Sequence, residues 1–275
     1  FASSLDQIGP FTHTVDDTAR LLDALSGHDS HDSTTASLPP TNALSTLNEE
    51  IATPVIGILP DELLDGCSDS VMTSYQSTLD VMKNAGWSVV TVELQGKDAW
   101  IPTYYILATA EASSNLARFD GVRYGVRPEL GNDEDVFTAT RTHGFGDEVK
   151  RRIMLGTYVL SSGYYDAYYK KGQQARRLVY DGYTALFTKC DALFLPTTPT
   201  TAFKRGEKSG NPIAMYLSDL FTVSANLAGI PAISFPTGTD TNGLPIGMQL
   251  QAATMRDEYL LNLTNKTVAL LSAKS

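Results

Sequence analysis

Arg152 is the residue whose type and position best suit it to ligand chemistry. The apolar residues around it recur at intervals of three and four, which predicts one buried face of a helix: Val149, Ile153, Gly156 and Leu160. Arg152 borders this stripe, whereas Arg151 points elsewhere. A guanidinium at the edge of a core is costly without a carboxylate partner, and its shape suits bidentate capture of one. An internal acid such as Asp120 or Asp166 can fill that role, and so can the carboxylate of a ligand.

Asp219 is the candidate of opposite charge. It stands with Ser218 ahead of an apolar helical pattern, so either residue can be the N-cap of that helix. The alternative is that Asp219 pairs with a cation, such as the ammonium group of an amino-acid ligand. Tyr104 and Tyr105, which are adjacent in the sequence, are expected in the core or at its rim unless they line a pocket.

Other motifs of catalysis or metal binding are missing from the sequence. There is no nucleophile elbow, phosphate loop, zinc-binding H-E-x-x-H or dinucleotide fingerprint. One group of metal-ligand types is present, but its spacing fits no specific ligand set: His28, Asp29, His31 and Asp32. We therefore expect a solvated loop there and no metal site.

Composition narrows the function classes further. The net charge of −10 and a pI near 4.8 argue against this chain binding the phosphate backbone of a nucleic acid by itself. No apolar run approaches the roughly 18 residues that a membrane span needs. Cys67 and Cys190 cannot form a disulfide framework, which favours a reducing compartment.

The elements that must position these residues alternate between strands and helices. Strands are expected at residues 54–60, 87–93, 191–196, 232–236 and 246–250. Helices are expected at residues 14–25, 68–85, 99–119, 145–161, 164–189, 215–228 and 257–273, and loops at 27–50 and 125–146.

The order of these elements predicts an α/β fold with a mixed β-sheet flanked by helices. Strand, helix, strand over residues 54–93 is a βαβ unit, so its two strands should be parallel neighbours. Asn242-Gly243 between the last two strands is a hairpin signal. No linker is evident, so residues 1–275 are expected to form a single domain.

Several segments, in the right order, resemble the amidase-signature family. The opening Phe-Ala-Ser-Ser-Leu-Asp-Gln-Ile-Gly-Pro-Phe-Thr is similar to the segment just downstream of that family's nucleophile. More particular stretches lie at residues 113–125, 148–153, 160–169, 226–231 and 243–249. They resemble the A-subunit branch of glutamyl- and aspartyl-tRNA amidotransferases, with likeness up to about residue 252.

This resemblance implies a Ser–Ser–Lys amidase that hydrolyses glutamine and passes ammonia to a partner. The family's lysine and both serines lie upstream of Phe1, so this chain is expected to be a C-terminal part without catalytic residues. By motif, Arg152 matches the arginine that binds the α-carboxylate of glutamine, and Asp219 matches the acid that binds its α-amino group. Tyr104 or Tyr105 would line the pocket, with Tyr104 preferred.

The resemblance also implies partners. The B and C subunits of the amidotransferase are expected, with misacylated tRNA reached only through the B-subunit, and with ATP and magnesium bound in the partner rather than in this chain. The bacterial cytoplasm or an organellar matrix is the expected location. Exposed apolar surface is expected where a longer protein would cover this part. The alternatives are a stand-alone amidase acting on another amide, and a non-catalytic interaction fragment.

Overall fold

The computed structural model describes residues 1–94, 96–131, 135–207, 215 and 217–274. Contacts divide the chain into two compact units. The helical unit consists of Phe1–Asp6 and Asp98–Leu178, and the sheet unit of Gln7–Lys97 and Val179–Ser275. Each is described below by itself. The single domain expected from the sequence therefore stays a prediction.

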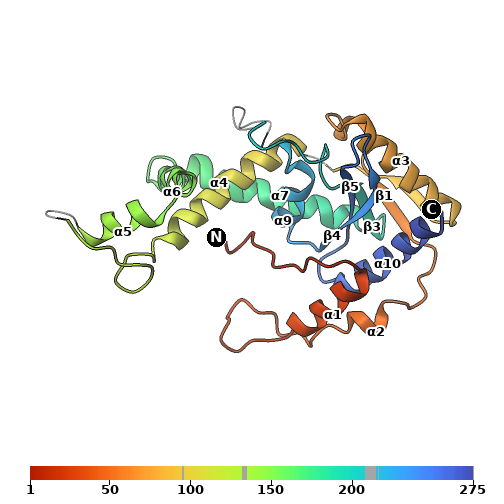
Figure 1. Ribbon diagram of the computed structural model, residues 1–275, viewed down its shortest axis with the longest axis horizontal. Helices are drawn as coiled ribbons and strands as arrows, with labels where there is room; N and C mark the ends of the chain where they lie inside the picture. The colour runs from red at the N-terminus through yellow and green to blue at the C-terminus, as the bar shows by residue number, and fades with distance from the viewer. Residues whose placement is uncertain (95, 132–134, 208–214, 216, 275) are drawn as a thin grey trace. The chain divides into compact units, whose positions relative to one another are not determined.

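The sheet unit is built on five strands in the order β2-β1-β3-β5-β4 (Figure 1). Their bounds are Val55–Ile58 (β1), Ser88–Thr91 (β2), Ala192–Pro196 (β3), Ala232–Thr239 (β4) and Pro245–Gln251 (β5). β1 pairs with β2 and β3 in parallel, and β5 pairs with β3 and β4 in antiparallel fashion. The mixed sheet, the parallel βαβ pair and the hairpin are confirmed.

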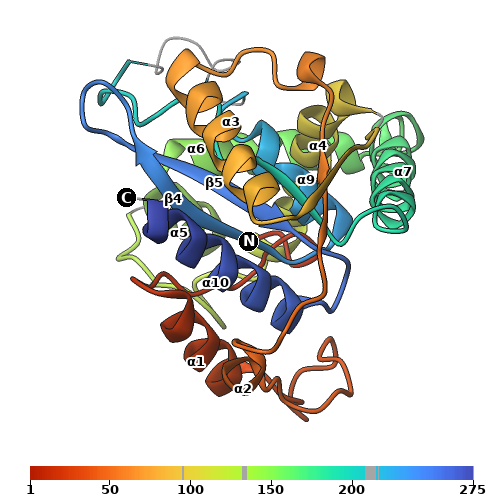
Figure 2. The same cartoon turned by 90° about the vertical axis from the view of Figure 1, so that its right-hand side faces the viewer.

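Helices cover both faces of this sheet. α3 (Asp69–Asn84) and α10 (Asp257–Lys274) pack on one face and contact each other (Figure 2). α9 (Leu220–Ala228) lies on the other face, where the side-chain Nε2 of Gln249 donates to the backbone oxygen of Phe221 at 3.1 Å. The hydroxyl of Tyr183 donates to Gln251 on the same face at 2.9 Å. Buried glutamines on β5 thus tie the helices of this face to the sheet.

The segment before β1 contains two helices, α1 (Val15–Leu25) and α2 (Ala43–Thr46). Thr14 caps α1 by accepting from the backbone N–H of Asp17. The expected loop at residues 27–50 is wrong at α2. Four residues are too short to show a helical period, and Asp23 of α1 anchors that turn by accepting from the N–H of Ala43 at 2.7 Å.

The helical unit contains α4 (Lys97–Leu116) from its second residue on, α5 (Val136–Gly144), α6 (Asp147–Leu160) and the π-helical turn η2 (Tyr165–Tyr169). α7 (Lys170–Leu186) follows and continues into the sheet unit. The loop expected at residues 125–146 is wrong at α5, and residues 132–134 of it lie outside the described residues. The side chain of Asp135 caps α5 by accepting from two backbone N–H groups, which starts a helix in a polar stretch.

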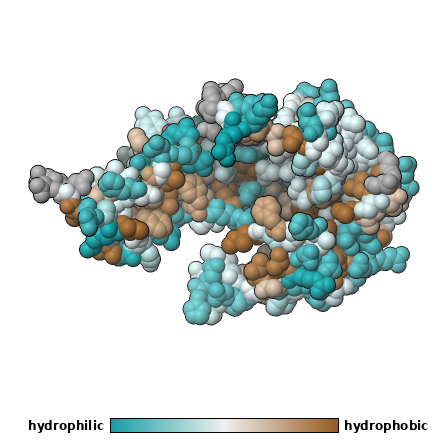
Figure 3. Space-filling view, in the orientation of Figure 1, coloured by the Kyte–Doolittle hydropathy of each residue, from teal (hydrophilic) through white to brown (hydrophobic). Residues whose placement is uncertain are grey.

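The described surface carries exposed apolar side chains, and whether a longer protein covers them stays a prediction. Ile8 and Phe11 of the sheet unit are 97% and 103% exposed, and Val126 of the helical unit is 84% exposed. Figure 3 shows hydrophobic patches among hydrophilic surface around α5. No described helix is both long and apolar enough to cross a membrane.

Candidate functional site

The close packing of α6 on α4 positions Arg152. Gly156 of α6 faces the backbone of Thr109 on α4 and leaves no room there for a Cβ atom. One turn further on, the hydroxyls of Ser113 and Thr157 are 2.9 Å apart. Because Arg152 lies one turn before Gly156, this approach of the two backbones brings its guanidinium onto α4.

Of the predicted stripe on α6, Gly156 is buried and the other three residues are partly buried; Val159, which was not predicted, is buried as well. Arg152 lies along this face, and its side chain is 26% exposed. Its Cζ atom lies 5.8 Å from the ring centroid of Tyr105 and 5.7 Å from that of Phe1. Aromatic rings at this range attract a cation through their π faces.

The acid that answers Arg152 is Glu148, whose Oε1 accepts from Arg152 Nε at 2.8 Å. The two internal partners suggested by the sequence are wrong. Asp120 is held by the backbone N–H groups of Val122 and Arg123, and Asp166 lies 3.5 Å from the ammonium of Lys170. Glu148 stands one helical turn before Arg152 on the same helix, so the ion pair forms within α6.

Glu148 pairs with two arginines. Arg151 also pairs with Glu148, so one carboxylate serves two guanidinium groups. The hydrogen bond from Arg152 lowers the pKa of Glu148. Burial is the largest single influence and lowers the pKa of Arg152, but the hydrogen bond and charge of Glu148, together with the charges of Tyr104 and Tyr105, raise the pKa above its ordinary value. Glu148 and Arg152 are therefore both ionised at neutral pH. Together with the guanidinium of Arg151, the three side chains carry a net charge of one positive unit.

The geometry of Arg152 also leaves its outer edge available. In the part of the chain that the structure describes, its carboxylate contact is made through Nε. A guanidinium presents five donors, and a carboxylate can bind the two terminal nitrogens end-on. Glu148 therefore fixes the orientation of Arg152 while the two terminal nitrogens face away from that acid.

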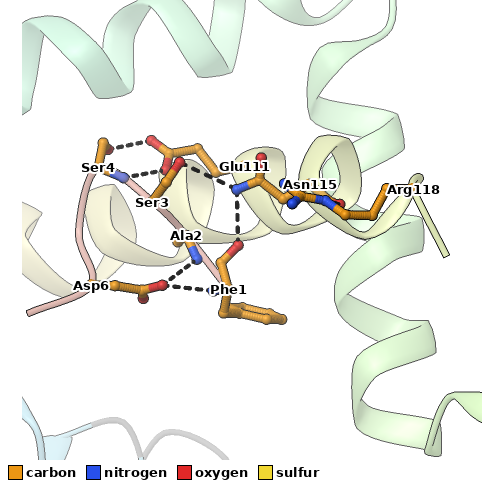
Figure 4. A network of polar contacts seen from close by, with 8 residues as sticks. All are labelled: Phe1, Ala2, Ser3, Ser4, Asp6, Glu111, Asn115 and Arg118. Carbon is orange, nitrogen blue, oxygen red and sulfur yellow. Dashed lines mark hydrogen bonds and ion pairs between the residues drawn. The ribbon is translucent and has the colours of Figure 1, made fainter. Parts of the chain in front are cut away.

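Phe1 reaches Arg152 through the strap, which we define as Phe1–Asp6. Figure 4 shows the strap lying along α4, with Glu111 and Asn115 directed toward it. The backbone N–H of Ser4 donates to Glu111 Oε2 at 2.9 Å, and its hydroxyl bonds to Glu111 Oε1. Asn115 Nδ2 donates to the backbone oxygen of Phe1 at 3.1 Å.

The two candidate tyrosines contact each other edge to face, with ring centroids 5.1 Å apart and planes at 79°. Tyr105 is the one whose ring lies beside the guanidinium of Arg152. Tyr104 packs on Tyr105 and raises the pKa of Arg152 through its charge. Which of the two lines a ligand pocket stays a prediction.

Asp219 belongs to the sheet unit, at the N-cap position of α9. Of the helix predicted at residues 215–228, residues 215 and 217 are helical, Ser218 and Asp219 form a turn, and α9 follows from Leu220; residue 216 lies outside the described residues. Gly229 ends α9 in the left-handed conformation, with a φ of 66°. The side chain of Asp219 makes no capping hydrogen bond, so capping does not account for this carboxylate.

Two neighbours of Arg152, Glu148 and Phe1, were not predicted from the sequence. Glu148 could have been found, because a glutamate four residues before an arginine is a helical ion-pair pattern. Phe1 carried no such signal, since 150 residues separate it from Arg152 and only folding brings them together.

The sequence also predicted that the loop with His28, Asp29, His31 and Asp32 holds no metal. Among residues 1–94, 96–131, 135–207, 215 and 217–274, no three potential metal ligands gather, and His31 contacts only Asp29 of the suspected loop group.

Comparison with known proteins decides the family. The family described as Amidase matches residues 1–261. The chain belongs to the amidase family. The A-subunit of glutamyl-tRNA(Gln) amidotransferase from Zymomonas mobilis is 50% identical over 264 residues, which cover 95% of this chain and 54% of that protein. The A-subunit from Wolinella succinogenes is 49% identical over 262 residues, covering 95% and 58%. The chain thus spans about half the length of these relatives.

Solved structures agree with this family assignment. The A-subunit of glutamyl-tRNA(Gln) amidotransferase from Thermotoga maritima aligns with a TM-score of 0.75 and 36% identity, covering 95% of this chain and 52% of that one. A peptide amidase from Stenotrophomonas maltophilia aligns with a TM-score of 0.72 at 21% identity, which shows a shared fold alone. The amidase-signature fold expected from the sequence is confirmed.

Proposed function

We propose that the protein holds glutamine for hydrolysis and that the ammonia released serves a tRNA-dependent amidotransferase. Relatives about 50% identical over nearly the whole chain are named as the A-subunit of such an enzyme. In this proposal, Arg152 binds the α-carboxylate of glutamine. Asp219 binds an α-ammonium group, and Tyr104 or Tyr105 borders the ligand.

The observation that carries the proposal is the state of Arg152. Its guanidinium is oriented by Glu148 through Nε, and the two terminal nitrogens face away from that acid. An arginine that binds an anion needs donors that its internal partner does not use. Arg152 has them. It therefore suits a carboxylate from outside the chain.

Catalysis would be shared with sequence outside these 275 residues. The chain spans about half the length of its relatives, and the family resemblance places the serine nucleophile and its lysine upstream of Phe1. Anchoring the substrate against a nucleophile supplied elsewhere is catalysis by positioning. On this proposal, the 275 residues alone do not turn over glutamine.

Partners follow from the same proposal. The B and C subunits would complete the enzyme, with ATP, magnesium and misacylated tRNA bound by the partner. No cofactor is proposed for this chain. A location in the bacterial cytoplasm or an organellar matrix follows from such a role in protein synthesis.

The proposal is tested by comparing amide donors in the full-length enzyme. L-Glutamine should be a much better donor than 4-aminobutanamide, which keeps the amine and the amide but lacks the α-carboxylate. The preference should nearly vanish in Arg152→Ala, because no carboxylate-binding group remains. Equal use of both donors by the wild type would overturn the proposal and favour a stand-alone amidase of another amide.

A further inference from the structure

Ser4 lies between two oppositely charged side chains of the helical unit. Its hydroxyl accepts from Arg176 Nη1 at 2.6 Å, and its backbone oxygen accepts from Arg176 Nη2 at 2.6 Å. On its other side, Glu111 accepts from both the N–H and the hydroxyl of Ser4. A serine hydroxyl has one donor and two acceptor sites, so this arrangement uses the donor and one acceptor.

The two charged residues come from different helices. Glu111 belongs to α4 and Arg176 to α7, so Ser4 joins both helices to the strap. Four bonds to one residue, each with a charged partner, exceed what is needed to tie down a surface segment. Ala2 and Leu5 on either side are 2% and 3% exposed and add apolar anchors.

The strap itself is a compact turn that can transmit this constraint. The N–H groups of Leu5 and Asp6 both donate to the backbone oxygen of Ala2, at 2.8 and 2.9 Å. The side chain of Asp6 accepts from the N–H of Ala2 at 3.1 Å. Fixing Ser4 therefore fixes Phe1, whose ring lies beside the guanidinium of Arg152.

We propose that Glu111 and Arg176 are positioning residues: by clamping Ser4 they hold the strap so that Phe1 covers one side of Arg152. This inference rests on the proposed role of Arg152 in binding the glutamine carboxylate. The covered guanidinium is shielded from water on that side, which strengthens its attraction for an anion. The clamp therefore serves binding of amino-acid amides and not the chemistry of the amide bond.

The direct test measures the strap and the substrate in the same variants of the full-length enzyme. Arg176→Met removes both donors to Ser4 but keeps the aliphatic stem. Arg177→Met, the exposed neighbour on the same helix, is the matched control for loss of one charge from α7. Ser4→Ala removes only the hydroxyl bonds and serves as a second variant if Arg176→Met fails to fold.

In Arg176→Met and Ser4→Ala, hydrogen–deuterium exchange of residues 1–6 should become faster. The KM for glutamine should rise about 3- to 10-fold, the size expected when a cation–π contact and its ordering hydrogen bonds are weakened. The kcat, and the rate with free ammonia as donor, should stay within about twofold. Ser4→Thr, which restores the hydroxyl, should recover the wild-type KM, and Arg177→Met should change neither measurement.

Two results would overturn the inference. Unchanged exchange of residues 1–6 in Arg176→Met and Ser4→Ala would show that the clamp does not hold the strap. Faster exchange with an unchanged glutamine KM would show that the strap is tethered but does not position Arg152. If the wild-type enzyme does not use glutamine at all, the proposed function fails by that result alone, and unchanged strap exchange would be a separate failure of the clamp.

Discussion

Gly156 and Thr109 are in such close contact that a side chain at residue 156 would meet the backbone oxygen of residue 109. The substitution Gly156→Ala should therefore push α6 away from α4. We expect it to lower the free energy of unfolding by about 1–3 kcal/mol, the usual cost of overpacking. Urea denaturation measures this directly. Gly144→Ala, at the end of α5 with open space around it, is the control and should cost much less.

The same substitution should impair glutamine use, because moving α6 withdraws Arg152 from Tyr105 and Phe1. A Gly156→Ala protein with wild-type stability and wild-type KM for glutamine would show that the close approach of α4 and α6 does not position the arginine.

Asp120 should make the helical unit sensitive to acid. The backbone N–H groups of Arg123 and Val122 hold the pKa of Asp120 well below its usual range. A carboxyl whose pKa is lower in the folded state contributes stability above its unfolded pKa, near 4, and loses it as pH falls toward the folded value. Asp120→Asn should therefore destabilise the protein at pH 7, and the difference from wild type should shrink below about pH 4.

Urea midpoints at pH 7 and pH 3 check this dependence. Glu129→Gln, an exposed acid in the same unit, is the control and should show little difference at either pH. A difference between Asp120→Asn and wild type that grows on acidification would contradict the account of Asp120.

The chain alone should not bind tRNA in a salt-sensitive way. Its net charge of −10 opposes binding to a phosphate backbone, and binding by counterion release requires clustered cations. A gel-shift titration at low and high salt measures this. A shift that weakens steeply as salt rises would contradict the proposal that tRNA is reached only through a partner protein.

The strands were predictable from the sequence because prolines and turn residues mark where they begin and end. β1 is a short apolar run between prolines, and β4 and β5 flank Asn242-Gly243, where Gly243 has a φ of 79° that suits glycine. α5 was not predictable, since its sequence is polar and its start depends on one capping side chain, that of Asp135.

The sequence predicted the position of Arg152 in the candidate site but not the residues that contact it. The helical period placed Arg152 at the edge of a buried face, which the structure confirms. Its partner was sought at distant acids, although Glu148 lies one turn away on the same helix. The contact with Phe1 and the clamp at Ser4 depend on tertiary packing of distant segments, which periodicity cannot reveal.

Asp219→Asn tests whether the charge of Asp219 serves a ligand. The side chain makes no capping hydrogen bond and asparagine is as good an N-cap as aspartate, so a change in helix capping cannot explain an effect of this substitution. If Asp219 binds the ammonium of glutamine, the lost charge should reduce kcat/KM for glutamine by an amount equivalent to about 2–5 kcal/mol of transition-state free energy. Rates with ammonia should survive. Equal loss with both donors would indicate a structural role for this residue.

The central claim is that Arg152 binds the carboxylate of glutamine, and steady-state kinetics of the full-length enzyme with two nitrogen donors test it most directly. Arg152→Ala should lower kcat/KM for glutamine by an amount equivalent to about 2–5 kcal/mol of transition-state free energy, the cost of removing one side of a buried charge pair. The ammonia-dependent rate should stay near wild type. Arg151→Ala, which removes the other partner of Glu148, should have a mild effect on both donors. Loss of both activities together in Arg152→Ala, or a critical Arg151 beside a silent Arg152, would contradict the claim.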